Sequence, residues 1–170
     1  EDFYDSPEKN FYLNSGQIDL IWEPAAHTDG DTVVVFRRDD VVVTGAIFDM
    51  TRFPVLDLKR GGSIQGEIDA INRLMDTEVT PVTPLKWREG LRYGTLVIPG
   101  RGQLSEQAEM VQYRDMLTII RDRVAYYMKQ GKSLAQIEAL RPAEGYAPRY
   151  GATTGSWTTD MFVEAVYDSL

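Results

Sequence analysis

Cysteine is absent from this 170-residue sequence, and histidine occurs once, at His27. Without cysteine the chain can form no disulfide, no catalytic thiolate and no cysteine-ligated zinc site. Basic residues are also scarce, because 18 lysines and arginines stand against 26 aspartates and glutamates. The resulting formal net charge of -8 argues against nucleic acid or an anionic membrane as the main partner. No apolar run is long enough to cross a membrane as a helix.

Two common catalytic patterns are missing as well. The sequence has no G-x-x-x-x-G-K-[ST] phosphate loop. Ser63 and Ser105 have no histidine other than His27 with which to form a triad, which argues against serine hydrolysis. The net charge favours a soluble protein. The chain begins at Glu1 rather than methionine, so we expect that it was processed, trimmed or cut from something longer. A secretory signal could have been lost upstream, and we leave its compartment open between secreted, periplasmic and other locations.

With 43% hydrophobic residues, the chain can build one domain with a real core. Alternating apolar residues predict strands, and apolar residues three or four apart predict helices. The order of these patterns predicts an α/β fold (α+β by some schemes), with a mixed sheet and covering helices. The expected strands are 11–13, 18–23, 32–37, 40–44 and 95–98, and the expected helices are 64–75, 105–130, a short one after Ser133 and a last one after Thr158 or Thr159. The segment 80–90 is expected to be a loop.

The valine-rich strands 32–37 and 40–44 are apolar nearly throughout, so both faces of their sheet should be covered. The helices of this chain can cover one face. We therefore expect the other face to need a second layer that the sequence does not contain. The chain should accordingly not act alone.

A series of motifs supports a more specific interpretation. The members of the series are, in chain order, His27-Thr28-Asp29-Gly30-Asp31, Thr44-Gly45-x-Ile47-Phe48, Gly61-Gly62-Ser63-Ile64-Gln65-Gly66 and Pro99-Gly100-x-Gly102. Two further segments, 109–116 and 157–163, follow them in the tail of the chain. The series resembles the C-terminal half of a metallo-β-lactamase-fold hydrolase, and the tail segments resemble the helical extension of one bacterial branch of that superfamily.

The resemblance implies an αββα sandwich of two similar halves, with one or two metal ions between the sheets. Residues 1–102 would form the C-terminal half of the sandwich. Residues 103–170 would form a helical extension packed on it in the same domain. The N-terminal half of such proteins carries an H-x-H-x-D-H motif, which this sequence lacks.

The resemblance also assigns three metal-ligand positions to this chain. His27 matches the histidine of an H-[ST]-x-G-D motif. Ala46 stands where the family has a metal-bridging aspartate, and Arg101 stands where it has a third ligand, a histidine. An arginine side chain stays protonated and does not coordinate metals. One of the three ligands therefore survives, and the two-metal site is predicted to be degenerate.

Nearby carboxylates do not make up for the missing ligands. His27 with Asp29, Asp31 and Asp49 is a weak donor set, since a catalytic zinc site usually needs three protein ligands. Asp29 and Asp31 are better explained as structural residues that accept backbone N–H groups in a turn. Arg101 could contact an anionic group, or it could point to solvent from a turn.

Three hypotheses follow. The favoured one is a metallo-β-lactamase-like subunit with a degenerate site, not catalytic by itself and completed by a partner N-terminal half or by a homo-oligomer. The second is half of an active zinc-dependent hydrolase in which His27 binds one zinc together with a partner half. The third is a metal-free enzyme in which Arg101 binds an anionic substrate. No cofactor is expected from this chain alone.

Overall fold

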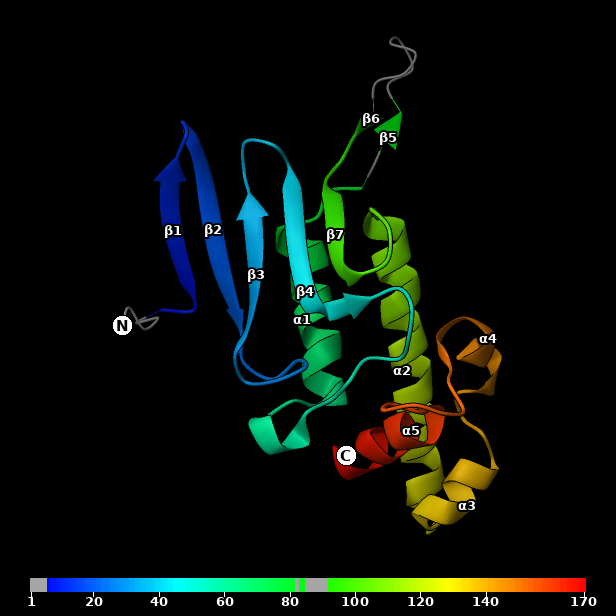
Figure 1. Ribbon diagram of the computed structural model, residues 1–170. Coiled ribbons are helices and arrows are strands. Elements are labelled where there is room, and N and C mark those ends of the chain that lie inside the picture. The colour runs from blue at the N-terminus through cyan, green and yellow to red at the C-terminus, as the bar shows by residue number, and fades with distance from the viewer. Residues whose placement is uncertain (1–5, 82, 85–91) are drawn as a thin grey trace.

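A computed structural model of the chain describes residues 6–81, 83–84 and 92–170. Its centre is a mixed five-stranded sheet with the order β1-β2-β3-β4-β7 (Figure 1). The first four strands run antiparallel to their neighbours, and β4 and β7 are parallel. The strands are β1 (Glu8–Leu13), β2 (Gly16–Glu23), β3 (Asp31–Phe36), β4 (Val41–Asp49) and β7 (Leu96–Arg101). The predicted α/β class with a mixed sheet is confirmed.

The first two strands lie at the predicted places, but β1 begins at Glu8 rather than at residue 11, and β2 begins at Gly16 rather than at residue 18. Asn14 and Ser15 connect β1 to β2, with φ angles of 50° and 64°. Two central residues at positive φ fit the right-handed twist of a two-residue hairpin. The hairpin of β3 and β4 follows with Val35 opposite Val42. These turns are local features, so the sequence reveals them.

Strands β4 and β7 are longer than predicted. The predicted strand 40–44 continues to Asp49, with register shifts after Val43 and after Gly45 in its pairing with β7. The segment from Pro99, predicted as a turn, belongs to β7 up to Arg101. Proline is tolerated there because β7 is an edge strand and needs no N–H on its outer side. The extension brings the ends of both strands to the site described below.

Two helices, α1 (Ile64–Thr77) and α2 (Gln107–Lys129), lie behind one face of the sheet (Figure 1). Both begin close to their predicted starts. Ser63 caps α1, and its Oγ accepts a hydrogen bond from the backbone N–H of Gly66 at 2.9 Å. The buried stripes are the predicted ones: Ile64, Ile68, Ile71 and Leu74 on α1, and Tyr113, Leu117, Ile120 and Val124 on α2.

The tail packs against the lower half of α2 (Figure 1). Ser133 and Gln136 form the predicted capping box, and Thr158 caps the last helix. Phe162 stacks on Phe53 with ring centroids 4.6 Å apart, which ties the tail to the segment after β4. The tail elements are α3 (Leu134–Ala139), the 3-10 turn η2 (Glu144–Tyr146), α4 (Ala147–Tyr150) and α5 (Thr159–Asp168). The short η2 and α4 were not expected.

The predicted loop 80–90 lies largely outside the described residues. Beside it, β5 (Thr83–Pro84) pairs with β6 (Arg92–Tyr93) in a short antiparallel ribbon that the sequence did not predict. Proline at position 84 favours a loop, but each of these two strands needs only two residues to form the ribbon. Among the described helices, none has the length and apolar character of a membrane-spanning segment.

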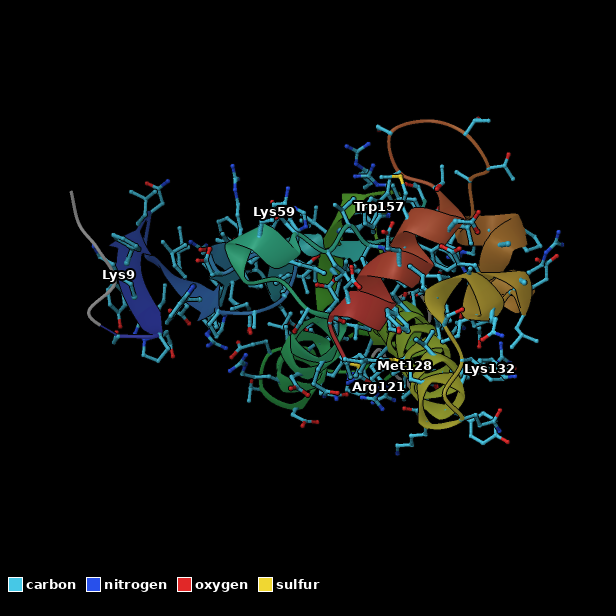
Figure 2. The ribbon with its side chains drawn as sticks, turned by 90° about the horizontal axis from the view of Figure 1, so that it is seen from below. Lys9, Lys59, Arg121, Met128, Lys132 and Trp157 are labelled. Atoms are coloured by element: carbon cyan, nitrogen blue, oxygen red, sulfur yellow. The ribbon has the colours of Figure 1, made fainter. Side chains whose placement is uncertain are left out.

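The second face of the sheet is apolar and carries no helix or strand of the described residues (Figure 1). Leu96 and Ile98 are 43% and 37% exposed there, whereas Val97 between them is fully buried against the helices. Strand pairing places eleven apolar side chains on this open face: Phe11, Leu13, Ile18, Leu20, Trp22, Val34, Phe36, Val41, Val43, Leu96 and Ile98. The sheet and the tail extend in opposite directions when the molecule is seen from below. Lys9 on β1 lies at one end, and Lys132, which follows α2, lies at the other (Figure 2).

Candidate functional site

A pocket of about 380 Å³ opens where β4 and β7 end. The structure brings the three positions singled out by the sequence, His27, Ala46 and Arg101, into this one pocket. Asp49 and Arg52 complete its polar lining. Gly45, Pro54, Val55 and Gly100 form the rest of the wall.

His27 is held in place by its backbone. The loop between β2 and β3 lies against the segment that leads into α1, and the backbone N–H of Asp57 donates to the His27 carbonyl at 2.9 Å. A side chain on Gly62 would begin 2.2 Å from that same carbonyl oxygen, so only glycine fits. The glycine pair of the Gly61-Gly62-Ser63 motif thus serves to bring α1 under the histidine loop.

The His27 ring has one nitrogen engaged. Its Nδ1 is hydrogen-bonded to the backbone carbonyl of Val55. A carbonyl can only accept, so Nδ1 carries the proton and the lone pair of the neutral ring is on Nε2. Metal-binding histidines are oriented in this way, with the second nitrogen donating to a carbonyl or carboxylate. His27 is therefore prepared to offer Nε2, although it is a single donor.

Ala46 and Arg101 come from the two parallel strands. A side chain on Gly100 would begin 2.3 Å from the carbonyl oxygen of Gly45, so the strands approach closely at this point only because glycine is present. Ala46 presents a methyl group, which cannot bind a metal. Arg101, paired in register with Asp49, places its Nε 3.8 Å from the Asp49 carboxylate.

Asp49 organises the pocket. Its side chain is only 8% exposed. One oxygen accepts from the backbone N–H and the hydroxyl of Thr51, at 2.8 and 2.7 Å. The other accepts from Nε of Arg52 at 3.1 Å and faces Arg101. These contacts occupy the carboxylate, so it acts as a structural anchor for two cations. Sequence reasoning missed Arg52, although its spacing of three from Asp49 was a usable signal.

Asp29 and Asp31 do not line the pocket. One carboxylate oxygen of Asp31 accepts from the backbone N–H of Thr28 at 2.6 Å, inside the turn. Asp29 contributes backbone groups: its N–H donates to the carbonyl of Arg60, and its carbonyl accepts from Trp22 Nε1, both at 2.6 Å. Both aspartates thus shape the loop that carries His27.

A buried acid lies behind this loop. Glu67 of α1 is fully buried, and its carboxyl oxygens have no hydrogen-bond partner among the residues that the structure describes. Burial raises the pKa of Glu67 well above its usual value, and the negative charge of Asp31 adds to the effect. Burial also raises the pKa of Tyr113, with further contributions from Glu67 and Asp49. Burial therefore favours the protonated form of the Glu67 carboxyl over the carboxylate, compared with a glutamate in water.

The donor set of this pocket does not fit a metal ion by itself. In the described part of the chain, no group of three or more histidine, cysteine, aspartate or glutamate side chains could hold one. His27 offers one nitrogen, and the oxygens of Asp49 are already engaged. A zinc site of this kind needs three protein ligands, so any metal here would require ligands from elsewhere.

No family model and no curated protein matches the chain. Solved structures do match. An inverting sec-alkylsulfatase from Pseudomonas sp. superposes with a TM-score of 0.66 and 13% identity, over 97% of this chain and 26% of that one. A metallo-β-lactamase from Pontibacter korlensis superposes with a TM-score of 0.50 and 15% identity, over 68% and 47% of the two chains.

At these identities the likeness concerns the fold. The chain spans about a quarter of the alkylsulfatase chain and less than half of the metallo-β-lactamase chain. Its mixed sheet, covered by helices on one face, corresponds to one portion of those larger proteins. The chain has a partial metallo-β-lactamase fold.

Proposed function

We propose that this chain is the C-terminal half of a metallo-β-lactamase-like sandwich whose two-metal site is degenerate, and that it does not catalyse a reaction by itself. The observation that carries the proposal is the pocket, which gathers His27, Ala46 and Arg101 at the end of the sheet. Two of these three positions cannot coordinate a metal. The glycine contacts that shape the pocket are nevertheless present.

The open face of the sheet is the argument for a binding partner. Eleven apolar side chains face outward there, in register across all five strands. A second sheet packed at about 10 Å would bury them, as in sandwich folds. The N-terminal half of the sandwich is the occupant we favour, because the chain matches only part of its structural neighbours. We propose that a second chain supplies this half. A homo-oligomer that buries the same face is the other arrangement.

A charge placed on the open face tests the need for this cover. We expect the purified chain to self-associate in sedimentation experiments or to bind the dye ANS, since a large apolar patch is exposed. Ile98→Lys on the open face should reduce both signals. Ile119→Lys on α2, where the native side chain is 39% exposed against 37% for Ile98, is the matched control and should not. A monomer that binds no ANS would refute the proposal.

A zinc-dependent hydrolase completed by a partner half is the second candidate, favoured by one observation. The Nδ1 contact of His27 with Val55 leaves Nε2 available as a ligand. Two histidines from an H-x-H-x-D-H half would complete a three-histidine site. The test is the zinc content of the complex with that half. One zinc per complex, lost in His27→Ala, supports the hydrolase; an intact complex without zinc supports the non-catalytic subunit.

A further inference from the structure

The pocket holds two arginines on one carboxylate. Arg52 and Arg101 both direct Nε toward the same oxygen of Asp49, at 3.1 and 3.8 Å. Thr51 engages the other oxygen through two hydrogen bonds. The arginine side chains are 35% and 61% exposed, while that of Asp49 is 8% exposed. A shielded anion thus lies beside two cations that line one cavity.

The two guanidinium groups have donors to spare. The contacts with Asp49 use only Nε, and within the described residues no partner is seen for their terminal nitrogens. Each terminal pair can donate to a planar oxyanion in a bidentate way. Ala46 is small, and Gly45 and Gly100 have no side chain, so these three residues take up little of the pocket's space.

The charge of the pocket sets the charge of its ligand. Two arginines face one aspartate, and the remaining wall carries no formal charge when His27 is neutral. The excess is one positive charge, which a single negative charge neutralises. A cavity of about 380 Å³ is at the small end of the range for organic ligands.

From these contacts we infer that the pocket is a binding site for the carboxylate of a small organic acid, held by Arg52 and Arg101 and ordered by Asp49. A monoanion is preferred to a phosphate dianion. No metal and no partner chain is needed. The inference therefore goes beyond the proposed function and can fail or succeed independently of it.

The test titrates the full chain with acetate, benzoate and inorganic phosphate at pH 8 and constant ionic strength, followed by NMR shifts of backbone amides around the pocket. Saturable binding of the carboxylates, tighter than that of phosphate, is expected. Arg52→Gln and Arg101→Gln should each weaken carboxylate binding about tenfold or more, because a charge-assisted contact is lost. Arg60→Gln should leave binding unchanged. Arg60 makes a similar ion pair, 3.7 Å from Asp57, but lies outside the pocket.

A second variant distinguishes the effect of the Asp49 charge from the effect of less well-ordered arginine side chains. Asp49→Asn leaves two arginines unopposed, so the ratio of phosphate to acetate affinity should rise. Loss of order alone would weaken both ligands and leave this ratio unchanged. The inference is overturned if no carboxylate binds saturably, if phosphate binds more tightly to the native chain, if Arg60→Gln weakens binding as much as Arg101→Gln, or if the ratio stays constant.

Discussion

Replacing Glu67 with glutamine is expected to remove a pH-dependent loss of stability. The native carboxyl is fully buried without a hydrogen-bond partner among the described residues. Burial, and secondly the charge of Asp31, raise the pKa of Glu67 in the folded chain well above 4.5. In the unfolded chain the carboxyl regains water and an ordinary pKa. Between these two values the folded state binds more protons than the unfolded state.

The sign of the effect follows from linkage. Stability contributed by protonated Glu67 is fully present below pH 4.5 and is lost as the pH rises through the raised pKa of the folded state. Between the two pKa values, a single titrating carboxyl lowers the free energy of unfolding by up to about 1.4 kcal/mol per pH unit. The neutral amide in Glu67→Gln does not titrate. As the pH rises, the free energy of unfolding of the variant should therefore increase relative to that of the native chain. Any advantage of the native chain at low pH should shrink or change sign.

The assay is urea unfolding of both proteins at several pH values from 4 to 9, at constant ionic strength. Glu164→Gln on α5 is the matched control, because the native side chain is exposed there. It should shift stability by less than about 0.5 kcal/mol at every pH. If the curves for the native chain and Glu67→Gln run parallel across the whole range, Glu67 does not carry a raised pKa and the reasoning is refuted.

Three further changes test the contacts around the histidine loop and α1. Gly62→Ala should destabilise the chain by about 3 kcal/mol or more in urea unfolding, because the added carbon meets backbone at 2.2 Å, whereas Gly145→Ala, with nothing within 4 Å, should be neutral. Arg73→Gln removes the arginine whose guanidinium holds the buried Glu23 carboxylate and should cost about 1–3 kcal/mol near neutral pH, measured in the same way. Ser63→Ala removes a helix cap and should lower stability by about 1 kcal/mol, with a matching loss of amide protection in the first turn of α1.

Local chemistry explains which parts of the fold could be predicted. The caps at Ser63, Ser133 and Thr158 depend on side chains within three residues of the helix start, so a single sequence shows them. The lengths of β4 and β7 depend on pairing between segments more than 50 residues apart. Gly45 interrupts the strand-like pattern of residues in β4, so the sequence does not show that the strand continues to Asp49. Strands β5 and β6 are too short to leave a pattern.

The three pocket positions were singled out for a different reason. His27, Ala46 and Arg101 were placed by resemblance to a family, and the structure brings them to one pocket. Arg52 was missed because the predicted strand ended at Thr44, which left the residues after it without a position. Once β4 reaches Asp49, the Asp49–Arg52 pair is fixed at the strand end. An error of five residues in one strand thus concealed half of the pocket's positive charge.

Under the proposed function, we expect Arg101 to disfavour a second metal ion. Asp49 is shielded from solvent and needs positive charge beside it, which Arg52 and Arg101 supply. A divalent ion next to these two cations would face strong repulsion and would find no free oxygen on Asp49. His27 lies in the same pocket, but its Nε2 is not used by this pair. If a partner half brings a metal, we expect it to bind beside His27, and zinc analysis of the complex should find one ion rather than two.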